Sequence, residues 1–116
     1  MILAPASLLA QLQATAGPTL AYSAIHQTEI QRVMVASVIA GNDKYGLYHA
    51  DSGQAASAGC ALHLDTILSG NVTVIPILAN EYGTGITVKA GGRIYVASSG
   101  TAAQTFSLYG VTRPGR

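Results

Sequence analysis

The sequence is poor in charge. Only 9% of its 116 residues are charged, against about 25% in an ordinary soluble domain. A folded monomer of this mass exposes about 5,900 Å², so its few charges would lie at about one per 500 Å². So little charge gives little electrostatic repulsion between molecules. The composition therefore indicates a subunit whose faces are covered by copies of itself or by partners. A stable monomer with a neutral, hydroxyl-rich surface is the alternative.

Basic residues are few and form no cluster. The net charge is +1, and the basic residues are scattered at Arg32, Lys44, Lys89, Arg93, Arg113 and Arg116. No group of adjacent phosphates would be neutralised, so no nucleic-acid partner is expected.

The chain has no long apolar run. Its first charged residue is Glu29, and MILAPASLLAQL at residues 1–12 superficially resembles a secretion signal. It has no basic residue ahead of the apolar run, which Gln11 and Gln13 interrupt. No window approaches the roughly 18 apolar residues that span a bilayer. No targeting signal and no membrane partner are therefore expected.

Cysteine is almost absent. Cys60 is the one cysteine, which excludes an intrachain disulfide and a cysteine metal cage. Between Gly59 and Ala61, Cys60 is expected to act as a small buried apolar residue. A single cysteine also fits assembly in a reducing cytoplasm. His63 and Asp65 are two residues apart, so they should share one face of a strand, which favours an exposed polar face; a metal site completed by His49 is the weaker interpretation.

Signatures of catalysis are also missing. Three of the five acids, Asp43, Asp51 and Glu81, fall in expected turns, where carboxylates cap backbone donors. No acid pair has a spacing that suits acid–base chemistry, and there is no Gly-x-Ser-x-Gly motif. Residues 90–92, Ala-Gly-Gly, form a tight turn with no helix after it to cradle a phosphate. We expect no enzyme, no cofactor and no metal.

What the sequence does have is alternation. In residues 85–111 the apolar side chains recur at every second position in three short runs: Ile86 and Val88, Ile94 and Val96, Phe106 and Leu108. A period of two is typical of strands with one buried face. Further strands are expected at 19–26, 31–40, 44–50, 62–65 and 72–78, where Pro76 favours an edge strand or a bulge.

About eight strands with short turns and no crossover helices predict an all-β fold, an antiparallel β-sandwich of jelly-roll type. The domain should span residues 19–116, preceded by an N-terminal arm at 1–18. In the arm, Pro5 and Ser7 favour the start of a short helix with Leu8, Leu9 and Leu12 on one side. These leucines either pack on their own domain or tether a neighbouring subunit.

Tyrosine is the main aromatic residue, with six copies against one Phe and no Trp. Tyr95 and Tyr109 have the opposite parity to the apolar residues of their strands, so they should face away from the core. Exposed tyrosines on an outer sheet are typical of protein interfaces. We therefore expect Tyr95 and Tyr109, with the arm leucines, to carry assembly. Stacking on a sugar is the alternative.

The order of these segments resembles that of small bacteriophage virion proteins. RVMVASVIAGN, then ITVKAGGRIYVASS, then a closing QTFSLYGV are similar to a family in which an "aGd-x-hyvyas" strand precedes "fslyGve". The likeness covers roughly residues 28–112 and is best over 86–111. The family's aromatic-Val-Pro-Ala-Gly opening is replaced by His26-Gln27-Thr28-Glu29.

The resemblance implies a β-sandwich accessory protein of the particle, without catalytic residues. The expectation is a capsid decoration or cement protein, located in the virion and assembled in the host cytoplasm. Its partners would be copies of itself and either the major capsid protein or tail proteins, bound through many symmetric contacts. The alternatives are a tail, baseplate or fibre component, and a receptor- or glycan-binding module using the loop at 51–59 with Tyr48 or Tyr82.

Overall fold

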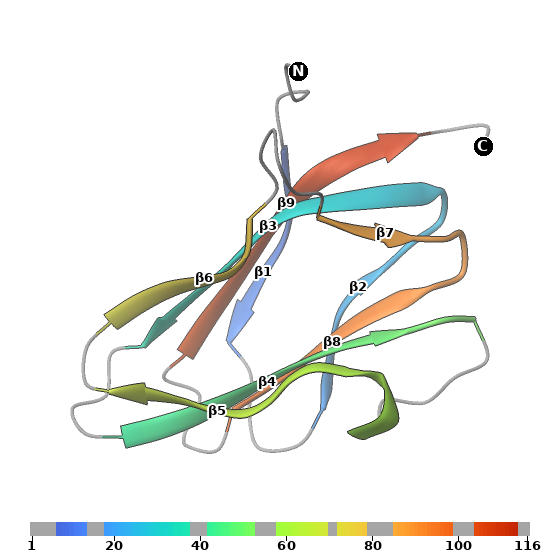
Figure 1. Cartoon of the computed structure of the whole chain (residues 1–116). Coiled ribbons are helices and arrows are strands. Elements are labelled where there is room, and N and C mark those ends of the chain that lie inside the picture. Colours follow the sequence, from blue (N-terminus) through green and yellow to red (C-terminus); the bar gives the residue numbers. More distant parts are fainter. Residues whose placement is uncertain are drawn as a thin grey trace.

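Most of the described residues lie in β-strands, as the period of two in the sequence predicts. The computed structural model describes residues 7–13, 18–37, 42–52, 58–69, 72–78, 85–98 and 104–113, and the structural statements below concern these. They contain nine strands and one short 3-10 turn (Figure 1): β1 Ser7–Gln13, β2 Thr19–Ser23, β3 Gln27–Ser37, β4 Asn42–Ala50, η1 Ala58–Cys60, β5 Ala61–Ser69, β6 Val72–Leu78, β7 Ile86–Val88, β8 Arg93–Ser98 and β9 Gln104–Arg113.

The strands form two antiparallel sheets packed face to face (Figure 1). The five-stranded sheet has the order β1-β9-β3-β6, with β7 also paired to β3, and the four-stranded sheet has the order β2-β8-β4-β5. With the short β7 set aside, the chain changes sheet at each connection except the β4–β5 hairpin. This is the strand order of a jelly roll. The all-β sandwich is confirmed.

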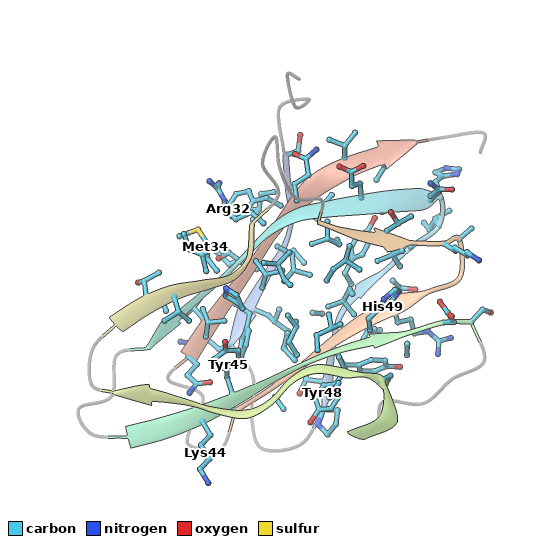
Figure 2. All side chains as sticks on the ribbon, in the orientation of Figure 1. Arg32, Met34, Lys44, Tyr45, Tyr48 and His49 are labelled. Atoms are coloured by element: carbon cyan, nitrogen blue, oxygen red, sulfur yellow. The ribbon has the colours of Figure 1, made fainter. Side chains whose placement is uncertain are left out.

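The core lies between the sheets and is built from the alternating residues. In β8 Ile94 and Val96 are buried, and in β9 Phe106 and Leu108 are buried. Val96 pairs with Leu47, and Leu108 pairs with Val33; both partners are also buried. The Tyr45 ring packs edge-on against Phe106 at 6.4 Å between centroids. The tyrosine is therefore part of the core, although its neighbour Lys44 points outward (Figure 2).

The helix predicted to begin at Pro5 and Ser7 is wrong for residues 7–13, which form a strand. Ser7–Gln13 is a β-strand paired antiparallel with β9. A register shift between Leu8 and Ala10 leaves Leu9 as an extra residue, and Leu9 packs against the core with Ala10 and Leu12. Leu9 and Leu12 therefore pack on their own domain, whereas Leu8 is 52% exposed; a tether to a neighbouring subunit stays a prediction.

Pro76 and the glycine turn at 90–92 have the positions in the fold that their sequence predicts. Pro76 is in β6, at one edge of the five-stranded sheet, beside a register irregularity opposite Val33 and Val35. An edge position and an irregular register both suit proline, because it has no backbone N–H to donate to a neighbouring strand. The turn after β7 has Gly91 at φ 88° and is closed by the Gly92 amide donating to the Lys89 carbonyl at 2.8 Å. That turn carries the chain from one sheet to the other, because β7 pairs with β3 and β8 with β4.

Candidate interaction surfaces

The outer face of the five-stranded sheet carries a row of three large side chains, here called the Tyr109 row. Leu8 on β1 lies opposite Tyr109 on β9, which lies opposite Arg32 on β3. The Arg32 guanidinium is stacked on the Tyr109 ring, with its carbon 4.3 Å from the ring centroid. The stack is a cation–π contact. The contact fixes the orientation of the Arg32 side chain on this face.

A bulge puts Arg32 on this face. Between Ile30 and Arg32 the register with β9 shifts, so Gln31 is an extra residue in β3. Ile30 points into the core, and the shift then places Arg32 outward together with Met34 (Figure 2). Gln31 donates from its amide to the Glu29 carboxylate at 3.3 Å. Pure alternation from residue 30 would have buried Arg32.

The next row on the same face is neutral and polar. Gln11 on β1 lies opposite Ser107 on β9, which lies opposite Met34 on β3. The Gln11 amide donates to the Ser107 hydroxyl at 3.0 Å. Around the Arg32–Tyr109 stack this face therefore combines apolar and hydrogen-bonding groups, with the Glu29 carboxylate on β3 as a second charged group.

The outer face of the four-stranded sheet carries a second row, here called the Tyr95 row. Leu20 on β2, Tyr95 on β8, Tyr48 on β4 and Ala61 on β5 are successive cross-strand neighbours. Leu20 is 48% exposed and Tyr95 is half-buried, whereas Tyr48 is 8% exposed. The Tyr48 ring lies along its strand over Gly46, where a Cβ would come within 3.1 Å of it. One end of this row is thus open and the other is covered.

The five residues predicted to carry assembly are divided by the structure. Leu9 and Leu12 pack against the core. Leu8, 52% exposed, and the half-buried Tyr95 and Tyr109 lie on the outer faces, with the parity predicted for the tyrosines. Their role as contacts stays a prediction. Sequence reasoning missed Leu20 and Arg32; only the cross-strand pairing reveals them.

Two of the tyrosines considered for glycan binding, Tyr48 and Tyr109, are poorly placed for stacking on a sugar. Tyr48 is buried, and one face of the Tyr109 ring is occupied by Arg32. Tyr82 and residues 53–57 of the 51–59 loop lie outside the described residues. The η1 turn packs near β4, and Cys60 at its end is partly buried.

The polar clusters in the described part of the chain are small. His49 is 3.8 Å from Asp51, measured from Nε2 to Oδ1, while the side chains of His63 and Asp65 lie outside the description. No group of three or more potential metal ligands occurs among the residues that were placed. Nor does any helix in those segments have the length and apolar character to cross a bilayer.

One buried hydroxyl pair joins β2 to β3. Thr28, fully buried, donates its hydroxyl to the His26 carbonyl at 3.0 Å and lies 2.9 Å from the Tyr22 hydroxyl. Because Thr28 has one hydroxyl proton, the Tyr22 hydroxyl is the donor in the second bond. His26 and Thr28 thus have a structural role in joining β2 to β3 at this end of the sandwich.

Replacing Thr28 with valine tests that role. We expect a loss of about 1–3 kcal/mol in the free energy of unfolding, because the isosteric change removes a buried acceptor from the Tyr22 hydroxyl. Tyr22→Phe alone should cost about 1 kcal/mol, and adding it to Thr28→Val should cost little more. Chemical denaturation of the three variants measures this. Strictly additive losses would contradict the shared hydrogen bond.

Comparison with protein-family models, curated proteins and solved structures finds no match for this chain.

Proposed function

We propose that the chain is a structural protein of a bacteriophage particle, a capsid decoration or cement protein that works by adhesion. The supporting observation is that each outer face of the sandwich carries a cross-strand row of large side chains, the Tyr109 row on one face and the Tyr95 row on the other. The sequence supports it through the low charge content and the resemblance of residues 86–111 to small virion proteins. The jelly roll itself hosts many functions and does not decide among them.

The proposed mechanism is multivalent binding. A face with one or two aromatic anchors gives a weak single contact, because hot-spot residues contribute most of the binding energy of an interface. On a symmetric shell many copies bind neighbouring sites, and a subunit held at one contact meets the next at high effective concentration. Copies bound across the seams between capsid subunits would then resist separation of those subunits.

Copy number tests the location. Purified particles should contain on the order of hundreds of copies of this chain, as a symmetric shell requires, measured by gel densitometry against the major capsid protein. A dozen copies or fewer would instead assign the chain to the tail or baseplate. Absence from particles, combined with saturable binding on a sugar array, would replace the proposal with a glycan-binding module.

A surface variant tests the mechanism. The double variant Leu20→Ala/Tyr95→Ala should bind particles stripped of this protein about tenfold or more weakly, because it removes the open end of the Tyr95 row. Ile25→Ala is the matched control, since Ile25 is 82% exposed but lies in the bend after β2, away from both rows. Particle pull-down across protein concentrations measures both. Equal binding by the double variant and the control would exclude the Tyr95 row from the contact.

A further inference from the structure

The edge strand β1 has features of a strand that pairs with another chain. Among the described strands it has one hydrogen-bonded neighbour, β9, and stands at the end of the five-stranded sheet. Leu8, Gln11 and Gln13 are exposed along it. Backbone groups on the far side of an edge strand are a template for one more strand.

The two edges of this sheet are built differently. At the opposite edge, β6 carries Pro76 and an irregular register, both of which discourage strand addition. β1 contains no proline and no charge. Its register shift lies near its start, and Ala10–Gln13 then pairs with β9 at every residue. Natural edge strands that are to stay single are commonly protected by charges, prolines or bulges, and the last four residues of β1 have none of these.

Charge argues that the added strand is the same strand of a second copy. When a strand pairs antiparallel with itself, side chains near the twofold axis meet their own counterparts, and like charges directly opposite are unfavourable. β1 offers only leucine, alanine, serine and glutamine to such a pairing. β2, which contacts β1 at the same side of the sandwich, is also uncharged and exposes Leu20. A neutral edge flanked by exposed leucines is thus compatible with its own copy and offers no counter-charge to a charged strand.

We propose that β1 pairs antiparallel with β1 of a second copy, so that the β1-β9-β3-β6 sheet continues into its partner. The inference deepens the proposed function, by naming the contact between copies, and rests on it for its biological purpose. Leu8, which is exposed on β1 itself, loses exposed area when the junction forms.

Self-association of the full chain, without particles, tests the pairing. Sedimentation analysis should give twice the 11.8 kDa chain mass for the unmodified protein, and Gln11→Lys should lower the mass twofold. Thr73→Lys is the matched control, because it adds the same charge at an exposed position of the opposite edge strand β6 and should leave the dimer intact. Mixing Gln11→Lys with Gln11→Glu should restore a dimer, since opposite charges then face each other.

A second variant and a second measurement guard against misfolding. Gln13→Lys places the charge at an exposed residue opposite Thr105, and thermal unfolding shows whether either variant still folds. In hydrogen exchange, the outward-facing amides of β1 should become protected as protein concentration rises.

The possible results separate this inference from the proposed function. A protein that stays at 11.8 kDa at high concentration, or a Gln11→Lys variant that remains dimeric, overturns the β1 pairing even if the protein attaches to particles. If the unmodified protein is a dimer that Gln11→Lys converts to monomers, but the protein never attaches to particles, the pairing is supported and the proposed function is excluded.

Discussion

Phe106→Ala should destabilise the fold by about 3–5 kcal/mol, because it opens a cavity at the centre of the core. Among the residues whose burial the structure describes, Phe106 is the largest fully buried side chain, and its ring contacts Tyr45 from the other sheet. A domain of this size is stable by only about 5–15 kcal/mol. The variant should therefore unfold at a much lower denaturant midpoint in chemical denaturation followed by circular dichroism.

Thr112→Ala is the control for this prediction. Thr112 lies on the same strand but is exposed, so its truncation should change stability by no more than about 0.5 kcal/mol. If the two variants unfolded at similar midpoints, β9 would not be the centre of the core.

Gly110→Ala should cost at least about 3 kcal/mol and broaden or abolish the unfolding transition. A Cβ at residue 110 would overlap the backbone carbonyl of Glu29 on β3 and come within 2.9 Å of the Leu9 side chain. Since the first obstacle is backbone of the central β3–β9 pair, the clash is relieved only by moving two strands apart. Denaturant unfolding and near-ultraviolet circular dichroism measure the effect.

Gly46→Ala is the matched control, since that Cβ meets the ring of Tyr48, at 3.1 Å from its nearest atoms. A side chain on an outer face shifts more easily than backbone, so the expected loss is about 1 kcal/mol. A Gly110→Ala variant as stable as Gly46→Ala would mean that β9 does not approach β3 this closely.

Much of the fold follows from local sequence. The period of two identified β8 and β9, and it assigned Ile94, Val96, Phe106 and Leu108 to the buried side. That assignment holds because alternation is a local property: a strand with one covered face needs apolar residues at every second position wherever it pairs. The same logic set Tyr95 and Tyr109 on the outer faces.

The candidate surfaces were only partly predictable. Among the register shifts of the described strands, the bulges at Leu9 and Gln31 interrupt the period of two, and each changes which residues face outward. Leu8, Leu9 and Leu12 span the bulge in β1 with a spacing that resembles that of a helix, and leucine, alanine and glutamine are good helix formers. The predicted helix was therefore the local preference, overruled by a distant partner.

The sequence alone determined that the chain is a sandwich of alternating strands with little charge on its surface, since patterning and composition are carried by each segment independently. Only the tertiary structure decided that Ser7–Gln13 is a strand, that Arg32 stacks on Tyr109, and that Leu20, Tyr95 and Tyr48 form one row. These depend on which strands become neighbours. Gln11 and Ser107 are 96 residues apart in the chain, and pairing at such a distance is set by the packing of the whole sheet.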